Sequence, residues 1–177
     1  VEWVQYIKKS MAEIAPNFTT KRMMDDYYRL FYNKLAKRSA QLHENNYAKV
    51  KEIVRWKEDT ASKWDTFEVV KLEFNPNQKM DYNSTNREVY GRVVIDRKDL
   101  QCDLAVECVV ANQQSADQTP EFVESYEFDL VKTEGSLLYF ETCKALNYPG
   151  NHLYGLRVYP KNPDLPHRMD FAYMRWI

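Results

Sequence analysis

Residues 56–74, WKEDTASKWDTFEVVKLEF, contain a change of hydrophobic period. Up to Trp64 the apolar residues recur at spacings of three and four, which is the period of an amphipathic α-helix. After Trp64 they alternate with polar residues and place Val70, Leu72 and Phe74 on one side, which is the period of a β-strand. The sequence therefore predicts helices before this point and strands after it.

The helical segment, residues 1–64, divides into two or three predicted helices. Residues 2–14 form an apolar stripe at helical spacing and end before Pro16, which lacks a donor N–H and disfavours helix at the residue before it. A second helix begins near Thr20. Residues 43–46, HENN, compete with helical hydrogen bonding and predict a break, after which helical spacing resumes.

Residues 65–177 alternate between apolar and polar positions in short segments separated by turn-rich loops. The predicted strands cover residues 67–74, 89–95, 104–110, 122–133, 137–145, 154–158 and 168–177. In the last strand we expect Met169, Phe171 and Tyr173 on one face. No helical period interrupts the series, which argues against a parallel sheet. We therefore predict an α+β protein, with N-terminal helices followed by a seven-stranded, immunoglobulin-like antiparallel β-sandwich.

The composition is that of a globular chain with no strong charge bias. Its 177 residues carry a formal net charge of −1, and 44% of them are hydrophobic. That balance leaves no overall positive charge for nucleic acid. No signal peptide is visible, and no apolar run has the length of a transmembrane helix. We expect a cytoplasmic protein that binds neither nucleic acid nor membranes.

The residue types that commonly hold metals or act as nucleophiles are few and scattered. They are His43, His152, His167, Cys102, Cys108 and Cys143. No CxxC or HxxxH spacing occurs among them, so we predict no metal site and no disulfide framework. Alternation around Cys108 and Cys143 predicts buried thiols. His167 and Asp170 allow an acid/base pair, but a loop histidine hydrogen-bonded beside an aspartate is the favoured interpretation. We predict no catalytic residue.

Aromatic residues are abundant, with 13 Tyr, 8 Phe and 4 Trp. Exposed aromatic rings on a sandwich can stack on the apolar faces of sugar rings. The candidates for such a surface are Tyr82, Tyr90, Tyr148, Tyr154 and Trp176. The alternative is that these side chains belong to the core.

Residues 17–32, NFTTKRMMDDYYRLFY, combine candidate N-cap residues with an aromatic helix face. The segment from Phe18 to Arg22, FTTKR, followed by this helix, resembles the C-terminal end of α-glucan (glycogen, starch or maltodextrin) phosphorylases. An ordinary capped helix is the alternative. Residues 157–167, RVYPKNPDLPH, extend the resemblance to bacterial members of that family that carry a C-terminal extension.

The resemblance implies a parent enzyme that cleaves α-1,4-glucan with phosphate, releases glucose 1-phosphate and uses pyridoxal phosphate. None of that family's catalytic or cofactor-binding motifs maps onto a residue here, so we assign no cofactor-binding residue. Residues 1–64 would be terminal helices that pack on the missing N-terminal catalytic body, and residues 65–177 would be an added sandwich. The chain opens at Val1 without Met, which suggests a piece of a longer protein. The alternative function is a non-catalytic carbohydrate-binding or protein-interaction module.

Overall fold

The computed structural model describes residues 2–75, 87–113, 119–146 and 152–177. The chain separates into two compact units, Val1–Glu52 and Ile53–Ile177. We call residues 2–52 the N-terminal helices.

The N-terminal helices follow the predicted order. They comprise α1 (Glu2–Glu13), α2 (Thr20–Tyr27), the π-helical turn η1 (Tyr28–Tyr32) and the first part of α3 (Asn33–Lys63). The Thr19 hydroxyl accepts a hydrogen bond from the Arg22 amide at 3.2 Å, which satisfies one of the free N–H groups of the first turn. Thr19 is therefore the N-cap of α2, as its position in the sequence suggests.

A break interrupts α3 where the sequence predicts one. Asn45, Asn46 and Tyr47 have φ angles of 50°, 55° and 61°, in the left-handed region. Asparagine tolerates this region because its short side chain bonds locally, whereas a bulky residue such as tyrosine is strained there. The two asparagines thus permit a change of chain direction that most residue pairs would resist.

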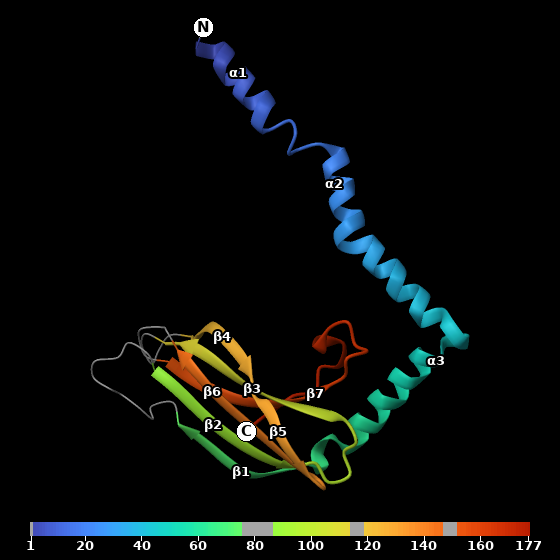
Figure 1. The fold of residues 1–177 in the computed structure, drawn as a ribbon, viewed down its shortest axis with the longest axis vertical. Helices are drawn as coiled ribbons and strands as arrows, with labels where there is room; N and C mark the ends of the chain where they lie inside the picture. Colours follow the sequence, from blue (N-terminus) through green and yellow to red (C-terminus); the bar gives the residue numbers. More distant parts are fainter. Residues whose placement is uncertain (1, 76–86, 114–118, 147–151) are drawn as a thin grey trace. The chain divides into compact units, whose positions relative to one another are not determined.

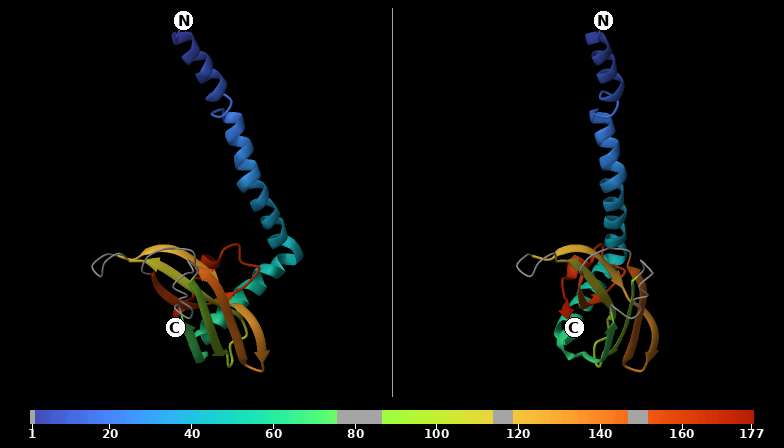
Figure 2. Two further views of the ribbon diagram at one scale, coloured as in Figure 1. Left: turned by 60° about the vertical axis from the view of Figure 1, so that its left-hand side comes forward. Right: turned by 90° about the vertical axis from the view of Figure 1, so that its left-hand side faces the viewer.

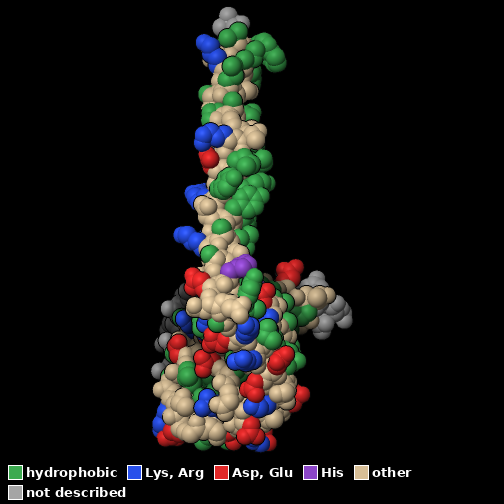
Figure 3. All heavy atoms as spheres, turned by 90° about the vertical axis from the view of Figure 1, so that its right-hand side faces the viewer, with side chains coloured by type: hydrophobic (Ala, Val, Ile, Leu, Met, Phe, Trp, Pro, Cys, Tyr) green, Lys and Arg blue, Asp and Glu red, His purple; other side chains and the backbone are tan. Residues whose placement is uncertain are grey.

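The apolar side chains of the N-terminal helices are largely exposed. Trp3 exposes 73% of its surface and Phe18 exposes 78%, and no described residue of this unit is buried. Figure 3 shows hydrophobic side chains gathered along one side of these helices and Lys and Arg side chains along the other. Ion pairs such as Lys21–Asp25 at 2.6 Å and Arg22–Asp26 at 3.0 Å suit a hydrated surface.

The second unit is an antiparallel β-sandwich of two four-stranded sheets (Figure 1, Figure 2). Its strands are β1 (Glu68–Asn75), β2 (Arg87–Asp96), β3 (Asp103–Asn112), β4 (Glu121–Glu127), β5 (Asp129–Glu134), β6 (Leu137–Leu146), β7 (His152–Lys161) and β8 (Arg175–Trp176). One sheet has the order β1-β2-β6-β5 and the other β4-β3-β7-β8. If β1 to β8 take the immunoglobulin letters A, B, C, C′, D, E, F and G in chain order, the two sheets read ABED and C′CFG, which is the immunoglobulin arrangement. The predicted α+β class and antiparallel sandwich are confirmed.

The number of strands differs from the predicted seven, because residues 122–133 form two strands. β4 and β5 belong to different sheets, and Phe128 lies between them. The Phe128 amide donates to the Val106 carbonyl at 2.8 Å, and its ring is buried in the core. The chain therefore crosses between the sheets at Phe128, although the apolar alternation of its sequence continues from Tyr126 to Leu130.

The predicted last strand over residues 168–177 is also wrong in its first half. Residues Arg168–Phe171 form the 3-10 helix η3, and only Arg175–Trp176 pair as β8. The His167 ring accepts from the Met169 amide, and the Asp170 carboxylate accepts from the His167 amide. This reciprocal cap closes a turn where the alternation of Met169 and Phe171 predicts extended chain.

A β-bulge changes which residues of β1 face the core. The register shifts between Val69 and Lys71, and Val70 is left exposed. Val69, Leu72 and Phe74 pair with inward-facing positions of β2 instead. The expectation that Val70 shares the apolar side is therefore wrong, because a bulge adds one residue to the strand.

The core joins the end of α3 and the 3-10 turn η2 (Trp64–Thr66) to both sheets. Trp64, Phe67, Val106, Phe140 and Val158 belong to one buried cluster. The compact unit begins at Ile53, ahead of the change of period, because the last turns of α3 pack with the strands. The domain division at residues 1–64 and 65–177 stays a prediction.

Candidate functional site

The segment after β7, residues 162–174, folds back onto the unit, and we call it the hook. The Lys57 ammonium donates to the Asp170 carbonyl at 2.7 Å, which ties the hook to α3. At the start of η3, the His167–Asp170 cap fixes the local turn. The favoured interpretation of this pair, a loop histidine hydrogen-bonded beside an aspartate, agrees with that geometry.

A ladder of four aromatic rings holds the hook in place. Phe171 and Tyr173 stack with their ring centroids 4.6 Å apart. Trp56 packs edge-to-face with Phe171, with the ring centroids 5.0 Å apart, and Trp64 packs edge-to-face with Tyr173, with the centroids 5.8 Å apart. Offset and edge-to-face contacts of this kind add to the area that the rings bury. The two hook aromatics are therefore fixed from the side of α3.

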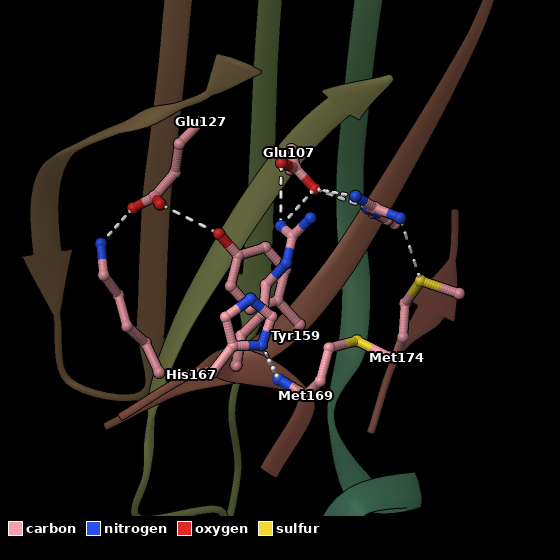
Figure 4. Close-up of polar contacts among 9 residues, drawn as sticks. Glu107, Glu127, Tyr159, His167, Met169 and Met174 are labelled. Atoms are coloured by element: carbon pink, nitrogen blue, oxygen red, sulfur yellow. Dashed lines mark hydrogen bonds and ion pairs between the residues drawn. The ribbon is translucent and has the colours of Figure 1, made fainter. Parts of the chain in front are cut away.

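Beneath the hook lies a buried carboxylate between two arginines. Glu107 is on the outer face of β3 and exposes only 5% of its surface. Arg157 donates through Nε and Nη2 to one carboxylate oxygen, at 2.6 and 2.5 Å, and Arg168 Nη1 lies 3.0 Å from both oxygens. Figure 4 shows the Glu107 carboxylate between the two guanidinium groups. We call these three residues the Glu107 cluster.

Hydrogen bonds keep Glu107 ionised despite its burial. Burial by itself raises the pKa of this carboxyl, but hydrogen bonds from Ser125 and the two arginines outweigh it, so the pKa lies below its ordinary value. Beside the cluster, the Tyr159 hydroxyl donates to Glu127 at 3.0 Å. Burial, together with this bond, raises the pKa of Tyr159 to about 12. Both groups therefore stay in one protonation state near neutral pH.

A cavity of about 240 Å³ opens between the hook and β7, and we call it the hook pocket. It is lined by Arg157, Tyr159, Pro160, Arg168, Met169, Phe171, Ala172, Tyr173 and Met174. Met169 and Met174 line it together with Tyr159, and Figure 4 shows these three side chains near the Glu107 cluster. Apolar and aromatic walls with a few fixed polar groups are the usual construction of a small-molecule site.

Of the five aromatic residues proposed from the sequence as a sugar-binding surface, the three that the structure describes lie in different environments. Tyr82 and Tyr148 lie outside the described residues. Tyr154 is half-buried and packs against the core, with its ring 5.7 Å from that of Phe74. Tyr90 is half-buried on β2, and Trp176 is exposed on β8. Phe171 and Tyr173, which line the hook pocket, fall in the segment that the sequence predicts as the last strand.

The remaining reactive residue types lie apart. Cys102 and Cys108 are buried, and burial raises the pKa of each thiol to about 11. Cys143 is exposed, so the prediction of a buried thiol there is wrong: it pairs with Tyr90, outside the inward set of β6. In the described ranges, no three His, Cys, Asp or Glu residues gather closely enough to hold a metal ion. No helix in those ranges combines the length and apolar character needed to cross a membrane.

The residues described here do not fit pyridoxal phosphate. That cofactor needs a lysine for its Schiff base and backbone N–H groups open to its phosphate. No lysine lines the hook pocket. A Cβ built on Gly91 would meet Phe128 at 2.7 Å, and one on Gly155 would meet Trp176 at 2.8 Å, so side chains already fill the space beside these glycines.

The geometry defines a class of protein: an immunoglobulin-like β-sandwich with helices ahead of it and a small pocket beside its last strands. The chain belongs to the glycogen phosphorylase C-terminal domain family, whose sequence profile matches residues 64–177. It is 28% identical over 178 residues to the maltodextrin phosphorylase of Thermococcus litoralis. That match covers 98% of this chain and 20% of the relative, so the chain spans about one fifth of the relative's length. No solved structure gives a significant match.

Proposed function

We propose that this chain is the C-terminal, non-catalytic region of an α-glucan phosphorylase. The observation that supports this is the pair of matches, one to a phosphorylase C-terminal domain and one to a fifth of a maltodextrin phosphorylase. The parent enzyme would transfer a glucosyl unit from the end of an α-1,4-glucan to phosphate and release glucose 1-phosphate. Its pyridoxal phosphate would be held by residues outside this chain, in a cytoplasmic protein.

In this proposal the N-terminal helices pack on the catalytic body of the enzyme. Their apolar side carries Trp3, Met11, Tyr27 and Phe31, all exposed. A helix hydrophobic along one side needs a partner surface, and packing of that side supplies most of a helix's stability. The other four fifths of a phosphorylase offer a partner of the right size. The opposite side, with its ion pairs, would face water.

Phosphorolysis assays test the proposal. Residues 1–177, given maltoheptaose, phosphate and pyridoxal phosphate, should release no glucose 1-phosphate. A complete phosphorylase polypeptide that ends with these residues should release it under the same conditions. Turnover by residues 1–177 would refute the non-catalytic role, and inactivity of the complete polypeptide would refute the enzyme assignment.

A second candidate function is a carbohydrate-binding module. The observation that favours it is the hook pocket, with two fixed aromatic rings and two arginines at its walls. It is compatible with the first, because an accessory domain can hold polymer near a catalytic body.

A further inference from the structure

We propose that the hook pocket binds one glucosyl unit of an α-1,4-glucan. The choice of glucose as the sugar rests on the proposed phosphorylase function. The choice of a sugar rests on the pocket itself, whose lining combines aromatic and apolar side chains with the guanidinium groups of Arg157 and Arg168.

The aromatic wall of the pocket includes Phe171 and Tyr173, whose rings stack on each other with their centroids 4.6 Å apart. The C–H groups on one face of a glucose ring make an apolar patch that packs on aromatic rings, while the hydroxyls point outward. Both rings are held from behind by Trp56 and Trp64, so little conformational entropy is lost when a ligand binds. An aromatic wall that is held in one position suits a small rigid ligand ring.

The polar side is formed by the Glu107 cluster. The buried carboxylate fixes Arg157 and Arg168 through four contacts, which leaves other N–H groups of these planar donors for ligand oxygens. Glu107 already neutralises one of the two positive charges and would repel an anion at the same position. Neutral hydroxyl oxygens, which need donors and no counter-charge, therefore match this wall better than phosphate does.

The size and rim of the pocket complete the match. A cavity of about 240 Å³ is smaller than the pockets that hold drug-sized ligands and admits a single sugar ring. Met169 at its rim exposes 66% of its surface, and Met174 also lines the pocket. Flexible thioether side chains can adapt to the next glucosyl unit of a chain that continues into solvent.

The test is a calorimetric titration of residues 1–177 with maltoheptaose, alongside cellohexaose, inorganic phosphate and glucose 1-phosphate. Met169→Trp fills the pocket and removes no core contact, because this side chain is exposed. Val131→Trp is the matched control, since Val131 is an exposed apolar residue on β5 of the other sheet. We expect maltoheptaose to bind, Met169→Trp to weaken it at least tenfold, and Val131→Trp to leave it unchanged.

Three outcomes would overturn the site. They are no maltoheptaose binding, equal loss in both tryptophan variants, and tighter binding of phosphate or glucose 1-phosphate than of maltoheptaose. A Met169→Trp effect on the activity of the complete polypeptide, without an effect on maltoheptaose binding, would assign the pocket to a protein contact instead. None of these outcomes tests the phosphorylase assignment, which is tested separately by turnover of the complete polypeptide.

Discussion

At the scale of single residues, Glu107 carries the largest predicted effect. Glu107→Ala leaves the guanidinium of Arg157, which is mostly buried, without its counter-charge. Breaking a buried pair from one side should lower the free energy of unfolding by about 3 kcal/mol. Urea denaturation of residues 1–177 measures it. Glu134→Ala, which removes an exposed partner of Lys132, is the control and should change stability little.

The same carboxylate makes stability depend on pH. The pKa of Glu107 is lowered in the folded state, so its contribution is complete above the ordinary glutamate pKa of about 4.3 and is lost as the pH falls through the folded value. The difference in melting temperature between the wild type and Glu107→Gln should therefore shrink below about pH 4.3. Melting curves that stay parallel down to pH 2 would contradict the ion pair.

Two glycines differ in how much room a methyl group would find. A Cβ at Gly91 would lie 2.7 Å from the ring of Phe128, which is buried and cannot move aside. A Cβ at Gly155 would lie 2.8 Å from the ring of Trp176, which is 55% exposed and can swing outward. Gly91→Ala should destabilise the fold by about 2 kcal/mol through overpacking, and Gly155→Ala by less. Equal losses in thermal denaturation would show that Trp176 is held as firmly as Phe128.

Sequence reasoning succeeds at residues whose role is local. Thr19 caps α2 because a hydroxyl before a helix can reach its free amides, and Cys108 is buried because it shares the inward phase of β3. Glu107 lies on the outer face of β3, as its place between two inward-facing residues predicts, yet the hook covers it. The alternation along a strand predicts which face of the sheet a residue lies on, but it does not predict which other segment covers that face.

At the scale of elements, the last turns of α3 belong with the sandwich. Thr60 and Trp64 are buried, and Trp56 supports the hook through Phe171. A chain of residues 53–177 should therefore unfold cooperatively. A chain of residues 65–177 should have a free energy of unfolding lower by at least about 3 kcal/mol, because the loss of the buried Trp64 side chain leaves a cavity in the core.

Denaturation of the two truncated chains by urea, followed by tyrosine fluorescence and circular dichroism, makes this comparison. Equal midpoints for the two chains would show that the helix end adds nothing to the sandwich. The aromatic ladder would then be a surface contact.

The change of period near Trp64 predicts where helix gives way to strand, and the break at residues 43–46 divides α3 as expected. The crossing at Phe128 is invisible in the sequence, because alternation continues while the hydrogen-bonding partner changes. The hook is missed for a similar reason: a cap between His167 and Asp170 decides the local structure, and hydrophobic alternation carries no information about caps.

At the scale of the whole molecule, the sequence suggests a phosphorylase tail, and the family match agrees. The hook pocket could not be predicted, because it joins β7 to residues that the alternation pattern assigns to a strand. The N-terminal helices raise a different question. Their exposed apolar side has no partner among the described residues of their own unit, so these helices should be only marginally stable in the isolated chain.

Hydrogen exchange followed by mass spectrometry tests whether the N-terminal helices pack on a catalytic body. It compares residues 1–177 alone with the same residues at the end of a complete phosphorylase polypeptide. We expect the amides of residues 2–43 to exchange near the rate of an unstructured peptide in the isolated chain and to be strongly protected in the complete one, with β2, β3, β6 and β7 protected in both. Equal exchange of residues 2–43 in the two proteins would contradict the claim that these helices pack on a catalytic body.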